Sequence, residues 1–292
     1  MSFTGLFVPL ITPFTASGDI ATEALQKLAN GVLDDGASGL VALGTTAESA
    51  TLTPRERRTI VDVCAEVSTE RRTPLIVGTG SNSTAESVHM LAELDSRATA
   101  ALAVVPYYTR PSEDGVVEHF RRLAAESPVP LVIYHIPYRT GLPLSAATLG
   151  RLARIPRIVG FKHSVGGIDE ATVAFMSDLP AGFSVLAGDD LYSGPLLALG
   201  ATGAILASAN VAAGDYADLV AAWRSGPIDR ARSRHDSLAP LTRALFAEPN
   251  PVVIKAVLAA RGRIPTPDVR LPLLAASSTS VTAALDAMDY LR

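Results

Sequence analysis

The feature that most constrains this sequence is a regular alternation of short apolar runs with helical segments. Eight such runs follow one another, mostly at intervals of about 25–35 residues, which is the length of a βα unit. They span residues 6–9, 40–43, 75–77, 102–105, 131–134, 158–161, 185–187 and 204–207. The runs are continuous rather than alternating with polar residues, which indicates parallel strands buried on both faces.

The segments between these runs carry helical patterns. Leu25, Leu28 and Val32 recur at helical spacing, and Thr53-Pro54-Arg55-Glu56 has the residues of a capping box. Eight strand–helix alternations without a hairpin signal predict an α/β fold, a (β/α)8 TIM barrel. The alternative is a doubly wound open sheet. It would need a glycine-rich phosphate loop after the first strand, where this chain has Pro9–Phe14.

The chain after residue 207 is longer than one barrel helix requires. A helix near 216–223 completes the barrel, and further helices are predicted over 229–246, 251–261 and 280–291. Asn250 and Pro251 fit the N-cap and first position of one of them. We therefore expect a barrel over 1–225 and a C-terminal helical extension over 226–292.

Composition excludes several classes of protein. The chain is 48% hydrophobic and 18% charged, which argues against disorder, and its net charge of −4 gives no basis for a nucleic-acid partner. The one cysteine, Cys64, lies in an apolar stretch and can form neither an internal disulfide nor a CxxC site. The histidines show no metal-ligand spacing, and no apolar run is long enough to span a membrane. We expect a cytoplasmic protein without a metal.

Lys162 is the most informative single residue. Of 25 basic residues only Lys27, Lys162 and Lys255 are lysines, and Lys162 directly follows the sixth apolar run and ends that predicted strand. A charged ammonium is costly at the end of a buried strand, so burial favours the neutral amine, which attacks ketones to form a Schiff base. The alternative is a salt-bridged core lysine. Lys27 and Lys255 lie in helical patterns, where solvation or pairing is expected.

Other polar groups follow strand ends, where barrel active sites form. Thr45 and Thr46 suit a small carboxylate, although an ordinary polar loop is an equal alternative. Tyr107 and Tyr108 offer an acid/base hydroxyl or a subunit contact.

The fifth strand contributes a phenol and a guanidinium. Tyr134 can shuttle a proton and Arg139 can grip a carboxylate. For His135, which follows Tyr134, a structural role is favoured.

The seventh strand is followed by Asp189 and Asp190. For these two acids we favour capping of the next helix.

The sequence resembles the dihydrodipicolinate synthase / N-acetylneuraminate lyase family of class I aldolases over nearly its whole length. The resemblance rests on GTTAES at 44–49, VVPYYTRPSEDG at 104–115, YHIPYRTG at 134–141, GFKHSVG at 160–166, LAGDD at 186–190 and LFAEPNPVVIK at 245–255. These motifs are specific jointly, in order and in spacing.

The resemblance implies a set of roles. Lys162 would form the Schiff base with pyruvate, with Tyr134 as the proton shuttle at the carbonyl. Thr46 would relay protons between Tyr134 and Tyr108 of a neighbouring subunit. The remaining roles are those of substrate contacts: Thr45 and Thr46 for the pyruvate carboxylate, Arg139 for the second substrate, and Gly188 and Ile205 as backbone lining. No cofactor would be needed, and a homotetramer, built as a dimer of dimers, follows from the same resemblance.

Within the family, RTG at 139–141 and the EPNP–K segment favour the synthase branch, which condenses pyruvate with the small aldehyde L-aspartate-4-semialdehyde in lysine and diaminopimelate biosynthesis. Arg139 favours this branch over aldolases or dehydratases of 2-keto-3-deoxy sugar acids and over N-acetylneuraminate lyase. A non-catalytic keto-acid-binding barrel is the more distant alternative.

The chain also departs from the synthase pattern. Ala47 replaces a glycine, and His135, Tyr138 and His163 stand where Asn, Ser and Glu are usual. We expect the last three at or near the second-substrate pocket, where Tyr138 would alter the choice of aldehyde.

Overall fold

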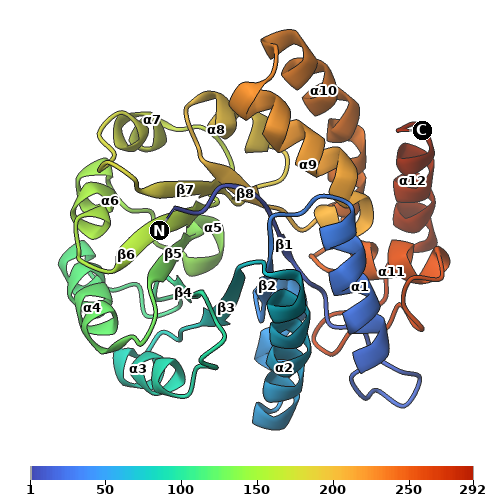
Figure 1. Ribbon diagram of the computed structural model, residues 1–292, viewed down its shortest axis with the longest axis horizontal. Coiled ribbons are helices and arrows are strands. Elements are labelled where there is room, and N and C mark those ends of the chain that lie inside the picture. Colours follow the sequence, from blue (N-terminus) through green and yellow to red (C-terminus); the bar gives the residue numbers. More distant parts are fainter. Residues whose placement is uncertain (1, 292) are drawn as a thin grey trace. The chain divides into compact units, whose positions relative to one another are not determined.

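Eight strands form a closed barrel in sequence order in the computed structural model, which describes residues 2–291 (Figure 1). The strands are β1 (Gly5–Pro9), β2 (Gly39–Ala42), β3 (Leu75–Thr79), β4 (Ala100–Val104), β5 (Leu131–His135), β6 (Ile158–His163), β7 (Ser184–Ala187) and β8 (Gly203–Ile205). Their residues are almost all buried, as continuous apolar runs require. The predicted (β/α)8 architecture is confirmed.

Helices separate the strands and continue beyond them. They are α1 (Thr22–Asp34), α2 (Pro54–Arg71), α3 (Thr84–Ala92), α4 (Glu113–Glu126), α5 (Pro137–Thr140), α6 (Ala146–Ala153), α7 (Glu170–Met176), α8 (Ser193–Ala198), α9 (Ala209–Ser225), α10 (Ile228–Leu245), α11 (Val252–Ala260) and α12 (Ser278–Asp289). The capping box predicted at Thr53 and Glu56 is present, with Pro54 as the first helical residue. Short 3-10 turns cover Thr45–Ala47 and Ser49–Thr51.

The chain divides into two compact units, each described by itself. One unit comprises the N-terminal residues through Gly5 together with Ile76–Ile205. The other comprises Leu6–Leu75 together with the chain from Leu206 onwards. The division predicted from sequence, a barrel to residue 225 and an extension from 226, remains a prediction.

The unit that contains Ile76–Ile205 has its core between strands and outer helices. β4, β5, β6 and β7 pair in parallel, with Ala103 opposite Ile133 and Ile133 opposite Phe161. Outside them run α4, α6 and α7 (Figure 1). The Phe161 ring packs edge-on against Phe175 of α7 at 5.3 Å between centroids. This packing fixes β6, whose last residues include Lys162.

The other unit joins the start of the chain to its C-terminal helices. β1 pairs in parallel with β2, and α9 packs on α10 through a hydrogen bond between Tyr216 and Thr242 hydroxyls at 2.6 Å. α11 is buried almost throughout. The helix is capped by Pro251 rather than Asn250, so the predicted N-cap is wrong. The Asn250 side chain is used elsewhere, as described below.

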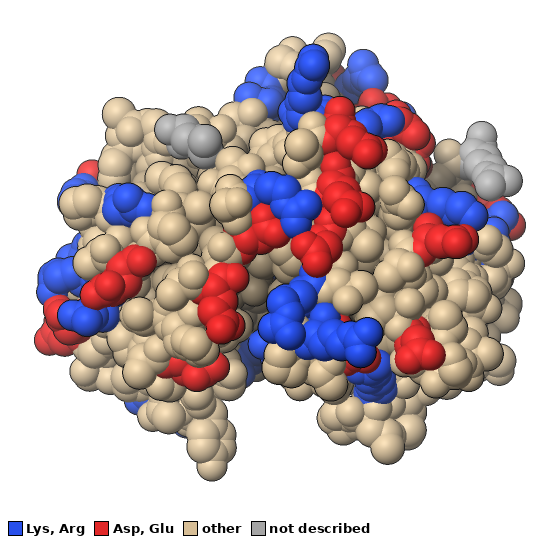
Figure 2. Space-filling model, turned by 60° about the horizontal axis from the view of Figure 1, so that its bottom comes forward, with Lys and Arg blue, Asp and Glu red and all other residues tan. Residues whose placement is uncertain are grey.

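Charges on the surface are locally balanced. In the view of Figure 2 acidic and basic side chains lie next to one another, and ion pairs such as Arg151–Asp114 at 2.7 Å and Arg154–Asp178 at 2.8 Å contribute to this pattern. Among residues 2–291 no helix combines the length and apolar character of a membrane span. Cys64 is fully buried, and burial raises the pKa of its thiol to about 12, which makes it unreactive.

Candidate active site

Lys162 and Tyr134 lie side by side at the ends of neighbouring strands. The parallel register of β5 and β6 places Tyr134 directly opposite Lys162. The Lys162 Nζ lies 4.2 Å from the centroid of the Tyr134 ring, and the two residues are 5% and 7% exposed. Within residues 2–291 Lys162 has no ion pair, so a buried primary amine stands beside a phenol without a carboxylate bound to it.

Gly188 closes one side of this lysine. It follows β7, and its backbone N–H donates to the His163 carbonyl oxygen at 2.8 Å. A Cβ at position 188 would lie 2.1 Å from Ser164 Oγ and 2.8 Å from Lys162 Cγ. Only glycine therefore lets the chain pass this close to the lysine stem. Ile205, the last residue of β8, is fully buried.

Arg139 belongs to a short polar cluster after β5. The single turn of α5 carries Tyr138 and Arg139, with the guanidinium carbon 5.9 Å from the Tyr138 ring centroid. Tyr138 donates from its hydroxyl to Asp189 Oδ1 at 3.3 Å, and the backbone N–H of Gly166 donates to Asp189 Oδ2 at 2.6 Å. Burial raises the pKa of Asp189, opposed by these bonds and by the charges of Lys162 and Arg139.

This cluster corrects the expectation for Asp189. The following helix, α8, begins after Tyr192 with no side-chain cap. The carboxylate of Asp189 instead serves the loop after β6 and the phenol of Tyr138. Sequence reasoning missed it because an acid shortly before a helix has the same local pattern whether it caps that helix or accepts bonds from another loop.

His135 and His163, two of the residues that depart from the synthase pattern, lie on the other face of their strands. Successive strand residues face opposite sides, so His135 and His163 point away from the side of Tyr134 and Lys162. His163 is hydrogen-bonded through Nε2 to Thr172 of α7 at 2.8 Å, and the two imidazole rings are 5.6 Å apart. Burial lowers their pKa values, to about 3 for His135 and about 4 for His163. Both imidazoles are neutral at physiological pH.

Tyr107 and Tyr108 lie on the surface after β4. Tyr108 is 87% exposed and its backbone has φ 68°, a left-handed conformation that is rare for a residue with a ring. Tyr107 is 40% exposed. An aromatic side chain held out in this way suits a contact with another subunit, which is the position that the resemblance implies for Tyr108.

The threonine turn is built within the other unit. Thr45–Ala47 form a 3-10 turn after β2, and Thr46 is 2% exposed. The Thr46 Oγ1 accepts a hydrogen bond from Asn250 Nδ2 at 2.9 Å, and Thr12 Oγ1 donates to the Ala47 carbonyl at 2.7 Å. Residues from the N-terminal part of the chain (Thr12) and from its C-terminal part (Asn250) thus both hold the turn in place.

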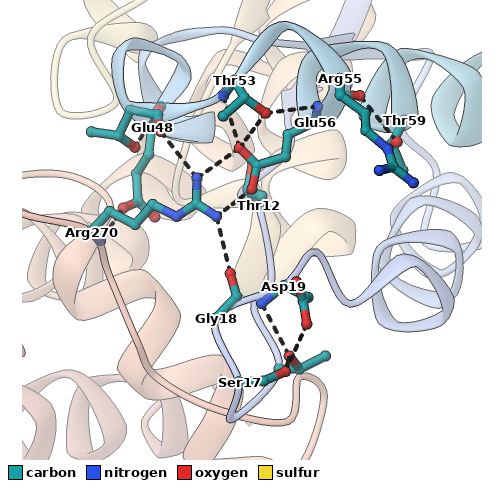
Figure 3. A network of polar contacts seen from close by, with 12 residues as sticks. Thr12, Ser17, Gly18, Asp19, Glu48, Thr53, Arg55, Glu56, Thr59 and Arg270 are labelled. Carbon is teal, nitrogen blue, oxygen red and sulfur yellow. Dashed lines mark hydrogen bonds and ion pairs between the residues drawn. The ribbon is translucent and has the colours of Figure 1, made fainter.

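Glu48 ends this turn and anchors a polar network (Figure 3). Its Oε1 accepts from Lys255 Nζ at 2.7 Å, and its Oε2 accepts from the Arg270 backbone N–H at 2.8 Å. The Arg270 guanidinium continues to Glu56, the third residue of α2, and lowers the pKa of that carboxyl to about 2. Lys255 is therefore ion-paired, which is one of the two states, solvated or paired, that the sequence predicted for it.

Sequence reasoning did not find Glu48, Asn250 or Arg270 as parts of this arrangement. Lys255 and Glu48 lie 207 positions apart in the chain. A single sequence has no local signal for such pairs. Among residues 2–291, no group of three or more His, Cys, Asp or Glu side chains is arranged to hold a metal ion.

Comparisons with known proteins agree over nearly the whole length of the chain. The profile of the Dihydrodipicolinate synthetase family matches residues 2–288. The 4-hydroxy-tetrahydrodipicolinate synthase of Syntrophus aciditrophicus is 41% identical over 281 residues, which cover 95% of this chain and 94% of that protein. The enzyme of the same name from Salinibacter ruber is 41% identical over 275 residues, covering 94% of this chain and 90% of that protein.

Solved structures give the same result. The dihydrodipicolinate synthase from Aquifex aeolicus superposes with a TM-score of 0.93 at 35% identity, covering 99% of this chain and 98% of that one. The synthase from Methylacidiphilum fumariolicum gives 0.92 at 34% identity, covering 99% and 95%. These matches confirm the resemblance inferred from the motifs. The chain belongs to the dihydrodipicolinate synthetase family.

Proposed function

We propose that this chain is a 4-hydroxy-tetrahydrodipicolinate synthase, which condenses pyruvate with L-aspartate-4-semialdehyde by way of a lysine imine. The observation that carries the proposal is the buried Lys162 amine, 4.2 Å from the Tyr134 ring and held by the packing of β6. Two relatives that bear this enzyme name are 41% identical over nearly the whole chain. Arg139 beside Tyr138 supports an acceptor that carries a carboxylate.

The chemistry begins on Lys162. Its neutral amine adds to the ketone carbon of pyruvate, and loss of water from the carbinolamine gives the imine. The imine takes up the electron pair when a proton leaves the pyruvate methyl group, so an enamine forms without an external cofactor. Tyr134 moves the protons at the carbonyl oxygen. Gly188 allows the chain to pass close to the Lys162 stem, where a Cβ would clash with it.

The second half consumes the aldehyde. Arg139 orients the carboxylate of the semialdehyde. The enamine carbon attacks the aldehyde carbon of this substrate, and a carbon–carbon bond forms. The substrate amine then attacks the imine carbon, and this intramolecular transimination releases Lys162 and gives the cyclic product. Thr45 and Thr46 are proposed as carboxylate contacts, with Ile205 as part of the lining and Thr46 as the relay between Tyr134 and Tyr108. The exposure of Tyr108 supports a homotetramer in which Tyr108 serves a neighbouring subunit.

Borohydride trapping tests the first half. Pyruvate with borohydride should give one covalent adduct, mapped by peptide mass spectrometry to Lys162. Lys27 and Lys255 are built-in controls, because one is exposed and the other is fully buried and paired. An adduct on either of these lysines, or none at all, contradicts the proposal and favours a non-catalytic barrel.

A panel of acceptors tests the second half. We expect kcat/KM with pyruvate to be highest for L-aspartate-4-semialdehyde. The reverse reaction on 2-keto-3-deoxy sugar acids and N-acetylneuraminate should be at least about 100-fold slower, because Arg139 matches a carboxylate and not a polyhydroxyl chain. Higher activity on a sugar acid would assign the chain to another branch of the family.

A further inference from the structure

The C-terminal part of the chain contacts the threonine turn at three points. Asn250 donates to Thr46 Oγ1 at 2.9 Å, Lys255 donates to Glu48 Oε1 at 2.7 Å, and the Arg270 backbone N–H donates to Glu48 Oε2 at 2.8 Å. The Lys255 and Glu48 side chains are 0% and 1% exposed. All five residues belong to one compact unit.

Glu48 is held in an unfavourable backbone conformation. Its φ of 54° and ψ of 34° are left-handed, a region that residues with a Cβ rarely adopt. The network in Figure 3 overdetermines this conformation, because Glu48 is fixed by the Arg270 backbone and the Arg270 side chain is fixed in turn by Glu56 and the Gly18 carbonyl. Such strain is retained where the surrounding structure positions a functional turn.

The bond from Asn250 has a directional consequence for Thr46. A threonine hydroxyl has one proton and two lone pairs. The Asn250 N–H occupies one lone pair, so the Thr46 proton must point away from Asn250, and one lone pair is left. Thr46 is thereby set to donate one hydrogen bond and to accept one more, which are the two capacities that a proton relay uses.

Packing alone does not explain Asn250. It does not cap α11, whose N-cap is Pro251. Its Oδ1 is buried and has no hydrogen-bond partner among the described residues. A residue selected only to stabilise the turn would satisfy both ends of its amide, since a buried unpaired acceptor is costly.

We infer that Asn250 is a positioning residue that directs the hydroxyl proton of Thr46, on a turn held by the Glu48–Lys255 ion pair. The inference rests on the relay role proposed above for Thr46. Asn250 touches no reacting atom in this scheme. It acts through Thr46, so its removal slows proton transfer without preventing formation of the imine.

A double-mutant cycle tests this coupling. Asn250→Ala should lower kcat about 10- to 100-fold, since misdirected acid–base groups forfeit much of their contribution, while KM for pyruvate and the borohydride adduct on Lys162 are retained. Thr46→Val removes the hydroxyl with little change of shape. In the Thr46→Val background Asn250→Ala should have no further effect on kcat, because its target is absent.

A charge variant adds a readout that a merely structural role would not move. Asn250→Asp replaces the donor by a carboxylate of the same shape, which accepts the Thr46 proton and turns it away from the relay. Its kcat should recover as the pH is lowered and the introduced carboxyl becomes a donor again. The matched control is Asn30→Ala, which removes an amide that donates to the Gln26 carbonyl in α1 and should leave kcat unchanged.

The outcomes separate the inference from the proposed function. Lack of a borohydride adduct in the unmodified enzyme defeats the proposed function itself. With the adduct present, the inference is wrong if Asn250→Ala keeps kcat within twofold or if its effect multiplies with that of Thr46→Val, which would indicate direct substrate contact. Full activity of Thr46→Val also overturns it. Circular dichroism and thermal melts of each variant identify losses that come from unfolding.

Discussion

Two buried lysines, one in each unit, show how the same side chain can be either reactive or structural. Lys162 and Lys255 each lie over an aromatic ring, at 4.2 Å from the Tyr134 centroid and 4.0 Å from that of Phe14. Lys255 is bound to Glu48 at 2.7 Å with neither side chain exposed, whereas Lys162 has no ion pair among residues 2–291. The carboxylate decides the difference, because a paired ammonium is fixed and an unpaired amine is free to react.

The largest expected effect is the loss of the reactive lysine. Lys162→Met should reduce activity at least about 1,000-fold, because the covalent step has no other nucleophile. Its free energy of unfolding should stay within about 1 kcal/mol, since no buried partner is left unpaired. Activity assays and urea unfolding measure both quantities, with exposed Lys27→Met as the control. A strongly destabilised variant would show that Lys162 is structural after all.

Removing the paired lysine, Lys255, should affect stability where removal of Lys162 affects activity. Lys255→Met leaves the Glu48 carboxylate buried and uncompensated, and we expect a loss of about 3–5 kcal/mol in the free energy of unfolding. The double variant Glu48→Gln with Lys255→Met should recover most of that loss, because no charge remains buried. Urea denaturation followed by circular dichroism measures it. Equal stabilities of Lys255→Met and the unmodified chain would remove the distinction between the two lysines.

Acid should weaken the surroundings of Lys162 at a higher pH than those of Lys255. His135 and His163 have folded pKa values of about 3 and 4, below the unfolded value of about 6.5, so the unfolded chain binds more protons as pH falls. Their stabilising contribution is complete above pH 6.5 and is lost progressively as pH falls from 6.5 to the folded values. Glu56, with a folded pKa of about 2, loses its contribution only between about pH 4.5 and 2.

Urea titrations at several pH values test this order. Between pH 7.5 and pH 4.5, the free energy of unfolding should fall by about 2–3 kcal/mol less in His135→Asn than in the unmodified chain. His89→Asn is the control, because His89 is on the surface of α3 with its side chain 62% exposed. An unchanged acid profile in the His135 variant would mean that this imidazole is not held neutral by burial.

The smallest expected effect concerns the acceptor. Tyr138→Phe deletes the hydrogen bond to Asp189, and we expect about a tenfold change in kcat/KM for the aldehyde, because one bond to a carboxylate is lost. The rate of borohydride trapping with pyruvate should not change, since the hydroxyl that is removed bonds to Asp189. The surface variant Tyr290→Phe is the control, as Tyr290 is 91% exposed. A changed trapping rate would place Tyr138 in the first half-reaction.

Local patterns carried much of the fold. Continuous apolar runs marked the strands, and the capping box at Thr53 marked the start of α2, because each depends only on neighbouring residues. Local reasoning went wrong at Asn250 and Asp189. Both have the chemistry and position of a helix cap, and both use their side chains on residues that lie elsewhere in the chain.

The sequence by itself determined the barrel, the family and the choice of Lys162, because strand periodicity, motif order and a lysine at the end of an apolar run are properties of short segments. Only the tertiary structure decided that Lys255 is neutralised by Glu48, that Asp189 binds Tyr138, and that His163 binds Thr172 of α7. These outcomes depend on which groups meet across long stretches of chain. Burial and charge pairing are set by those meetings, and a single sequence does not encode them locally.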